Sequence, residues 1–477
     1  METEGTDQRA QPERPADPPL PSGGTPSPTG GAELASDEAS ATGYPLHFSR
    51  PSPVDYPRSV VDVEPVGGKI RVFAEDFEVT EIPLYPFCGR GEHCYVTVVK
   101  TNRTTLEVAE YFARSLGLKS IDVGFAGFKD RRAVARQTFS LMGVHKDRVW
   151  PLETSWLHIA DVTYHQNKLR TGHLRGNRFR IRIRGVQADA LARARAILAR
   201  LHEVGVPNFY GPQRFGRFGD NYEVGCAMLH RNPQAVADHL LAPRPGAETE
   251  TFRARYHDGD YEGALAELPP GRPAEAGILH GLRRREGSFR VAVRRIPREL
   301  KRMFYSAYQS FLFNWCLRER LEWAADAHGT IWPGDLAFLH AKGACFGVGD
   351  GGDDLDDARR RARAGELSPS GPIFGRKMIV PRGREGDLEQ AVLAAEKLRP
   401  GSFLSHVKGI HLDGSRRPYR VPLDEVEVVE EREGEETHLV VSFALPPGSY
   451  ATIPLREIMG VATDEEPLPT AGDDATA

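Results

Sequence analysis

The sequence contains no run of about 18 apolar residues, the length that an α-helix needs to cross a bilayer. Its first ten residues carry acidic side chains and lack the apolar core of a signal peptide. These two absences predict a soluble protein without a membrane partner. We expect it in the cytoplasm.

Cysteine is scarce, with five residues in a chain of 477: Cys88, Cys94, Cys226, Cys316 and Cys345. Five scattered cysteines do not form a disulfide framework, and their odd number leaves at least one free thiol. His93 beside Cys94 lacks the second ligand pair of a zinc site. The sequence therefore predicts reduced thiols and no metal.

Motifs for binding nucleotide phosphates or for metal-dependent hydrolysis are also missing. Neither GxxxxGK[ST] nor HExxH occurs. Gly347, Gly349 and Gly352 have the spacing of a dinucleotide fingerprint, but Asp350 and Asp353 beside them would repel a pyrophosphate. These observations argue against a dinucleotide-dependent enzyme and a P-loop enzyme.

What is present is an apolar fraction of 40%, enough for a sizeable core, in a chain long enough for two or more domains. The net charge of −4 is unevenly distributed. Residues 1–44 hold eight acidic and two basic side chains, and residues 461–477 hold five acidic and no basic ones, which leaves +7 for residues 45–460. A basic body fits a polyanion such as RNA, although many other domains are equally basic.

Changes in composition divide the chain. Residues 1–58 and 461–477 are predicted to be disordered, acidic tails, because they have too few large apolar groups to offset the entropy of ordering. Residues 59–204 alternate predicted strands and helices, and residues 205–422 have helical stretches with long Gly- and Pro-rich connections. Residues 423–460 return to a strand-like pattern, most clearly over 438–459. We expect a first domain that is interrupted by a second and completed by this C-terminal segment.

The first domain has specific local signals. Residues 67–83 alternate apolar and polar side chains as a strand does, and residues 94–101 follow as a second strand. Thr104 and Glu107 form a capping box ahead of an amphipathic helix, and Gly117 stands where that helix should stop.

A tight loop is predicted between the strand-like segments of residues 120–143, and it contains Asp130. In GNRFRIRIRG (176–185), arginines alternate with apolar side chains, so Arg180, Arg182 and Arg184 should share one face of a strand. We expect these guanidinium groups near RNA phosphates; the alternative for one of them is an ion pair with a sheet carboxylate.

Four blocks resemble the TruD family of tRNA pseudouridine synthases: AGFKDRRAVARQ (126–137), GNRF (176–179), GVPNFYGPQRFG (205–216) and LPPGSYATIPLRE (445–457). Shorter pieces fall in family order between them, namely EDFEVTE (75–81), SAYQSFLFN (306–314) and WPGDL (332–336). The resemblance covers about residues 59–460. It implies an α+β fold, in which a pseudouridine synthase catalytic fold with a mixed β-sheet is interrupted by a helix-containing TRUD insertion domain.

The resemblance also implies a tRNA-modifying isomerase that needs no cofactor, with uridine 13 as the expected target. Asp130 corresponds to the family's catalytic aspartate, an ionised carboxylate that can attack the sugar or remove its proton. From the residues alone, Lys-Asp after Gly-Phe is more typical of a turn or helix cap. Lys129 is expected to orient or charge-balance the site, or to touch a phosphate.

The family positions that surround the target nucleotide correspond to Arg71, Phe77, Lys129, Asn177, Phe179 and Tyr450. Asn177 would hydrogen-bond near the flipped base while Phe77 and Tyr450 line its pocket, and ordinary core packing is the alternative, above all for Phe179. Arg71 replaces an expected lysine and keeps its charge. Tyr450 replaces an expected phenylalanine and adds a hydroxyl group.

Gln213 and Arg214 are expected either to face RNA or to lie between the two domains. A non-catalytic RNA-binding protein would use the same basic and aromatic residues, so it is one alternative to the isomerase. An RNA glycosylase that uses Asp130 to release the base is another. The expected partner is tRNA, with no obligate protein partner.

Overall fold

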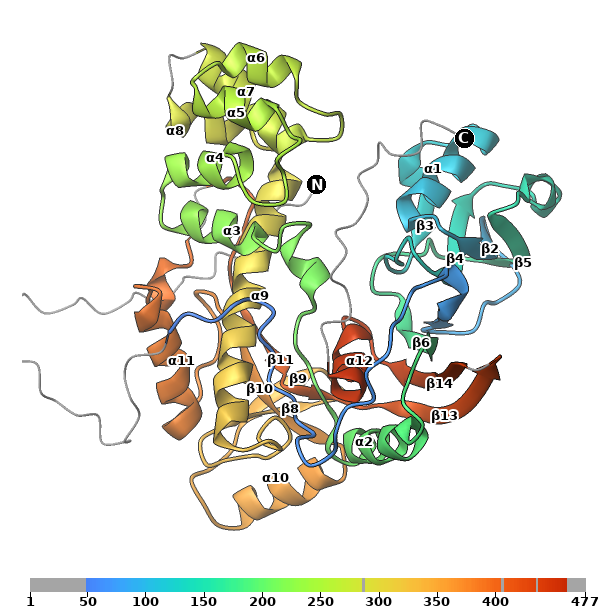
Figure 1. Ribbon diagram of the computed structural model, residues 1–477, viewed down its shortest axis with the longest axis vertical. Coiled ribbons are helices and arrows are strands. Elements are labelled where there is room, and N and C mark those ends of the chain that lie inside the picture. Colours follow the sequence, from blue (N-terminus) through green and yellow to red (C-terminus); the bar gives the residue numbers. More distant parts are fainter. Residues whose placement is uncertain (1–48, 285–287, 405–406, 435, 461–477) are drawn as a thin grey trace, which may run out of the picture. The chain divides into compact units, whose positions relative to one another are not determined.

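The computed structural model describes residues 49–284, 288–404, 407–434 and 436–460. These residues belong to one compact unit, and Figure 1 labels most of its helices and strands. Residues 1–48 of the first predicted tail, and the whole predicted tail 461–477, lie outside the described residues.

An eight-stranded mixed sheet forms the first region. Its strand order is β13-β14-β6-β1-β4-β2-β5, with β3 paired to β4. β1 and β4 run parallel, and the other pairs are antiparallel. The strands are β1 (Phe77–Pro83), β2 (His93–Thr101), β3 (Val123–Phe125), β4 (Val134–Met142), β5 (Leu157–His165), β6 (Leu174–Ile183), β13 (Asp424–Glu433) and β14 (Glu436–Leu445). The predicted α+β class with a mixed sheet is confirmed.

Three helices pack with this sheet: α1 (Thr105–Leu116), α2 (Ala190–Val204) and α12 (Thr452–Met459). α1 has the predicted capping box, with Thr104 and Glu107 each satisfying the other's backbone N–H, and it ends at Gly117 in the left-handed conformation. α2 contacts β13, and α12 contacts α2. The C-terminal segment therefore belongs to the same sheet region as residues 77–183.

The chain between α2 and β13 is mainly helical and surrounds the long helix α9 (Figure 1). Its helices are α3 (Asn221–Leu229), α4 (Pro233–Leu241), α5 (Phe252–His257), α6 (Tyr261–Ala266), α7 (Pro273–Arg284), α8 (Phe289–Ala292), α9 (Arg298–Trp323), α10 (Asp353–Arg363) and α11 (Gly383–Ala395). A four-stranded sheet has the order β11-β10-β8-β9. Its strands are β8 (Leu336–Leu339), β9 (Ala344–Gly347), β10 (Leu367–Ile373) and β11 (Ser415–Pro418).

Two short strands lie where this middle segment begins and ends. β7 (Val206–Pro207) pairs antiparallel with β12 (Arg420–Val421). Gly205, at φ +89°, makes the turn that leads from α2 into β7, and an added Cβ there would lie 2.9 Å from the Arg420 side chain. The chain thus leaves the first region and returns to it at one place.

Two predicted strands are shorter than expected. Over residues 67–76 the backbone forms only an isolated bridge from Lys69 to Arg184 and a 3-10 turn at Ala74–Asp76. Asp76 causes the change, because its carboxylate accepts the backbone N–H of Phe73 at 2.8 Å and pairs with Arg184. β1 therefore begins only at Phe77.

The second half of the predicted strand over residues 438–459 is wrong, because residues 452–459 form α12. Pro454 lies in the first turn of this helix, where its missing N–H costs no hydrogen bond. The helix buries Ile453, Leu455 and Ile458, an apolar set that alternation alone did not separate from a strand.

The predicted disordered tail of residues 1–58 is wrong at its C-terminal end. Tyr56 is buried and donates its hydroxyl to the carbonyl of Tyr210 at 2.7 Å. Arg50 pairs with Glu396 at 2.7 Å and with Glu223 at 2.8 Å. Composition missed this segment because its few anchoring side chains are diluted by proline and serine.

Candidate active site

The Asp130 loop is held from two neighbouring elements. The Thr105 hydroxyl, in the first turn of α1, accepts the backbone N–H of Lys129 at 2.9 Å and donates to Gln137 Oε1 at 3.0 Å. Gln137, on β4, donates its Nε2 to the carbonyl of Gly127 at 2.6 Å. The Gly-Phe-Lys-Asp loop is therefore fixed at Gly127 by β4 and at Lys129 by α1.

The carboxylate of Asp130 accepts hydrogen bonds from two segments far apart in the chain. Arg71 Nη2 lies 2.8 Å from Oδ2, and Gln213 Nε2 lies 3.0 Å from Oδ1. The Asp130 side chain remains 33% exposed, so these contacts do not enclose it. The result is a positioned carboxylate that a substrate can still reach.

Arg71 adopts a left-handed backbone conformation, with φ +56°, which is uncommon for a residue other than glycine. Its guanidinium carbon lies 4.2 Å from the ring centroid of the buried Phe77. This cation–π contact and the Asp130 contact together orient the arginine. Such a backbone conformation costs energy and persists only where surrounding contacts hold it, as the Phe77 and Asp130 contacts do here.

Lys129 is not placed to contact a phosphate, which was one of its two predicted roles. Its side chain is only 3% exposed, and its Nζ lies 2.9 Å from the carboxylate of Glu81. Burial raises the pKa of Glu81, and the ion pair with Lys129 opposes that rise. Lys129 is thus buried beside the loop, and contact with an external phosphate is excluded for this conformation.

A second buried lysine, Lys100 on β2, lies at the same loop and was missed by the sequence analysis. Its Nζ donates to the backbone carbonyl of Asp130 at 3.0 Å and also to the carbonyl of Arg103. Burial lowers the pKa of Lys100 to about 8. Its burial could have been predicted from the alternation of the strand, because Lys100 lies on the same strand face as the buried Val96 and Val98.

Asn177, on β6, lies directly opposite Glu81 of β1. Glu81 in turn binds Lys129, so the two strands place Asn177 on the face that supports the Asp130 loop. The side-chain Oδ1 of Asn177 is buried and has no hydrogen-bond partner among the described residues. An acceptor in this state is destabilising unless a ligand or water satisfies it.

Phe179 is packed in the core, as its alternative interpretation stated. It is 7% exposed, with ring centroids of Phe77 and Phe443 at 6.1 and 5.5 Å. It therefore supports the ring of Phe77 from the side.

Tyr450 follows β14 and approaches the beginning of the middle segment. A Cβ added at Gly211 would lie 2.8 Å from its ring, so glycine permits this contact. Burial raises the pKa of the Tyr450 hydroxyl, while Arg214 and Arg417 act in the opposite direction. Asp130 also contributes to the rise, so Tyr450 lies among these three charged groups.

Gln213 and Arg214 lie in the 3-10 turn Pro212–Phe215. Gln213 donates its Nε2 to Asp130 of the sheet region at 3.0 Å, so it joins the start of the middle segment to that region. Arg214 donates its Nε to the hydroxyl of Ser310 at 2.9 Å and its Nη2 to the hydroxyl of Ser306, both on α9. This turn therefore connects α9 with the Asp130 loop.

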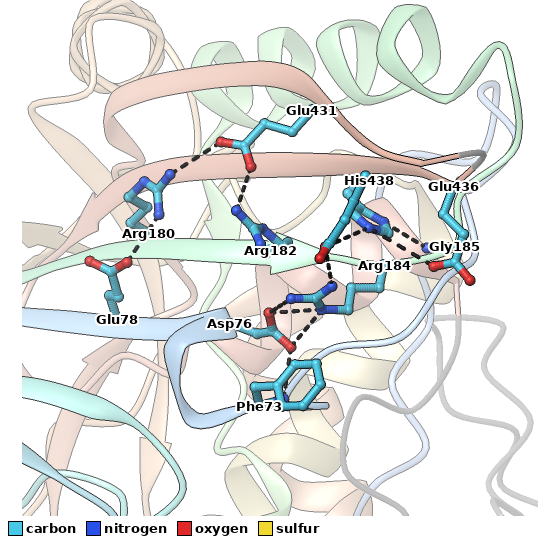
Figure 2. Close-up of polar contacts among 11 residues, drawn as sticks. Phe73, Asp76, Glu78, Arg180, Arg182, Arg184, Gly185, Glu431, Glu436 and His438 are labelled. Carbon is cyan, nitrogen blue, oxygen red and sulfur yellow. Dashed lines mark hydrogen bonds and ion pairs between the residues drawn. The ribbon is translucent and has the colours of Figure 1, made fainter.

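The three arginines of β6 and its end are all paired with carboxylates, as Figure 2 shows. Arg180 binds Glu78 at 3.0 Å and Glu431 at 3.3 Å, and Arg182 also binds Glu431.

Arg184 binds the buried Asp76 at 2.8 Å and the exposed Glu433 at 2.9 Å. Carboxylates of β1, of β13 and of the 3-10 turn at Asp76 therefore engage all three guanidinium groups, and their contact with RNA phosphates stays a prediction. The alternative that was considered for one of them applies to all three.

A pocket of about 780 Å³ lies elsewhere, between Pro243 and Glu267. Within its charged lining, Arg253 pairs with Glu250 and Arg255 pairs with Glu267. Within the described ranges, no three His, Cys, Asp or Glu side chains are grouped to hold a metal ion. No helix of the described chain is long and apolar enough to span a bilayer.

Comparison with known proteins identifies a family. The family model described as tRNA pseudouridine synthase D (TruD) matches residues 54–458. A tRNA pseudouridine synthase D of Geobacter metallireducens is 43% identical over 396 residues, which cover 82% of this chain and 95% of that protein. A tRNA pseudouridine synthase D of Thermus thermophilus is 36% identical over 422 residues, covering 87% of this chain and 97% of that protein.

The fold has a counterpart among solved structures. The crystal structure of a protein from Methanosarcina mazei assigned as tRNA pseudouridine synthase D (TruD) superposes with a TM-score of 0.71. It is 24% identical, and the match covers 85% of this chain and 96% of that one. At this identity the likeness supports the fold.

Proposed function

This chain belongs to the TruD family of tRNA pseudouridine synthases, and we propose that Asp130 is the catalytic group with which it isomerises uridine in tRNA. The observation that carries the proposal is the carboxylate itself. It is one-third exposed, oriented by Arg71 and Gln213, and mounted on a loop fixed by α1 and β4. A turn cap would not need contacts from two distant segments.

The reaction breaks the bond between N1 of uracil and the sugar, rotates the base, and rejoins it through C5, from which a proton must leave. An ionised carboxylate can attack the sugar carbon or remove a sugar proton, and either route uses the same charged oxygen. Arg71 and Gln213 donate to the two oxygens of Asp130 and hold them in fixed directions. All atoms of product come from the substrate, so no cofactor is proposed.

Residues around Asp130 would receive the flipped nucleotide. We assign to Asn177 a hydrogen bond with the base or ribose, which its unsatisfied Oδ1 supports. Tyr450 is assigned to the aromatic surface on which the base rests, while the buried ring of Phe77, with Arg71 against it and Phe179 behind it, supports the site. Arg71 would remain close to the reacting sugar, since it already holds Asp130.

The division into a catalytic domain and an insertion domain remains part of the proposal. We assign residues 59–204 and 423–460 to the catalytic domain and residues 205–422 to the TRUD insertion domain. The pairing of β7 with β12 supports boundaries near residues 205 and 422, because the insertion begins and ends there side by side. Asp130 would then act at the place where Gln213 of the insertion reaches the sheet region.

The expected substrate site is uridine 13 of tRNA, and the expected location is the cytoplasm, where tRNA is abundant. The test is incubation of the full chain with unmodified tRNA, followed by pseudouridine mapping. Formation of pseudouridine without change in tRNA mass is the expected result, and modification at another position would contradict the proposed target. Loss of uracil would instead indicate a glycosylase, and binding without modification would contradict catalysis.

A further inference from the structure

Two arginine side chains, those of Arg214 and Arg417, lie beside the ring of Tyr210. The guanidinium carbon of Arg417 lies 4.2 Å from the ring centroid, and that of Arg214 lies 5.5 Å from it. The backbone of Tyr210 is fixed, because its N–H donates to Asn314 Oδ1 at 2.9 Å and its carbonyl accepts from Asn314 and Tyr56. Two cations are thus held near one rigid aromatic ring.

Among the described residues, the hydrogen-bond partners of both arginines are neutral. Arg417 donates to the side chain and carbonyl of Asn208 and to the carbonyl of Gly448 at 2.9 Å. Arg214 donates to two serine hydroxyls of α9.

Throughout residues 49–460, apart from the gaps stated above, no carboxylate forms an ion pair with either arginine. Nη1 of each makes no hydrogen bond to a described residue, and neither atom is buried. Two full positive charges are therefore left to attract an anion.

These charges lie next to the proposed reaction centre. Both act on the hydroxyl of Tyr450, which Asp130 also influences, and Gln213 beside Arg214 donates to Asp130. Asp130 is already paired with Arg71, so its single charge does not balance the two arginines. An anion that approaches Asp130 together with the target uridine would balance the charges of the two arginines.

We propose that Arg214 and Arg417 form a phosphate-binding site for the tRNA backbone beside the uridine to be isomerised. Nη1 of each guanidinium group keeps its N–H donors for a phosphate oxygen, and both side chains are pre-oriented by Tyr210 and by their neutral partners. The phosphate must be bound beside the target because a flipped nucleotide loses the base stacking that held it in place. This assignment rests on the proposed function, since it takes tRNA as the ligand.

The test compares R214Q and R417Q with R180Q and R182Q in the full chain. The control pair removes the same charges from β6, where carboxylates already neutralise them. The dissociation constant of an unmodified tRNA transcript is measured over a range of NaCl concentrations. Each of R214Q and R417Q should lower the slope of log K against log salt by about 0.7 to 0.9, the value of one lost phosphate contact, while the controls leave it unchanged.

Turnover distinguishes binding from chemistry. For R214Q and R417Q we expect a raised KM for tRNA with kcat changed much less, because Asp130 and Arg71 remain in place. A parent-like salt slope in both folded variants, or an equal fall in the controls, would overturn the phosphate site.

If either glutamine variant unfolds early, R214K and R417K take its place. Lysine keeps the charge, so the parent slope should be retained, and a lowered slope would contradict the assignment. This test can be distinguished from the test of the proposed function, because it measures only the salt dependence of tRNA binding. A D130N protein that remained active would refute the catalytic assignment without altering the salt slope.

Discussion

The exposed face of β6 and the surroundings of Tyr210 both gather arginines, but they differ in what those arginines contact. On β6 and at its end, Arg180, Arg182 and Arg184 pair with carboxylates of β1, of β13 and of the 3-10 turn at Asp76. Around Tyr210, Arg214 and Arg417 meet hydroxyl, amide and carbonyl groups in the part of the chain that the structure describes. The more conspicuous cluster in the sequence is therefore the neutralised one.

The comparison shows that a run of basic residues does not locate an anion site. Ion pairs across a sheet lower the charge that a phosphate can sense, and exposed pairs of this kind add little to stability. Neutral partners hold a guanidinium group in place without reducing its charge.

The largest difference should appear between D130N and E431Q, because each replaces a carboxylate that two side chains hold. Asp130 is held by Arg71 and Gln213, and Glu431 by Arg180 and Arg182. We expect D130N to lower pseudouridine formation at least about a thousandfold with tRNA affinity nearly intact, since the amide is neither nucleophile nor base. E431Q should retain parent activity.

Both activities are measured on preparations whose melting curves show folded protein. A D130N rate of a tenth or more of the parent rate would remove Asp130 from the chemistry. Equal losses in the two variants would mean that the comparison reports stability instead.

Among the arginines of this face, R184Q should destabilise far more than R180Q. Arg184 is the partner of Asp76, which is 1% exposed, so its loss leaves a buried carboxylate without its cation. We expect the free energy of unfolding to fall by roughly 3 kcal/mol. Arg180 has exposed partners, and R180Q should cost less than about 1 kcal/mol. Urea unfolding of both variants measures this, and equal values would contradict a special role for the Asp76 pair.

Lys100 and Lys129 extend the same contrast to the core, because Lys129 has a carboxylate partner and Lys100 has carbonyl partners. K100M should free the Asp130 backbone and lower kcat about ten- to a hundredfold with little change in tRNA binding. K119M, at an exposed lysine, is the control. Unchanged kcat in K100M would show that Lys100 does not position the loop.

A pH measurement sharpens the same prediction. Burial lowers the pKa of Lys100 from 10.5 to about 8, so between these values the unfolded chain binds more protons than the folded one. The free energy of unfolding of the parent should therefore rise relative to that of K100M as pH increases from about 8 to about 10. A difference that stays constant or shrinks would show that Lys100 titrates normally.

The smallest effect should follow deletion of residues 1–48. Within this segment, residues 1–44 carry a net charge of −6. If none of those acids neutralises Arg214 or Arg417, tRNA affinity and turnover should stay within about twofold of the parent, since separated exposed charges are largely screened. Tighter binding after deletion would show that they do. Deleting residues 1–58 instead removes the Tyr56 and Arg50 contacts and should lower the melting temperature.

The sequence by itself determined much of the first region and the position of Asp130. The α1 capping box, the loop between β3 and β4, and the alternation of β6 were all predicted because they depend on residues close together in the chain. The four sequence blocks identified the family for the same reason, since each is a short contiguous motif.

Only the tertiary structure decided which charges are balanced. Glu431 and Glu433 lie about 250 positions from the arginines that they neutralise, and Gln213 reaches Asp130 across 83 positions. Arg417, placed beside Tyr210 by β11, had no signal in the sequence. Electrostatic balance depends on distance in space, and strand order and chain crossings set that distance without leaving a local pattern.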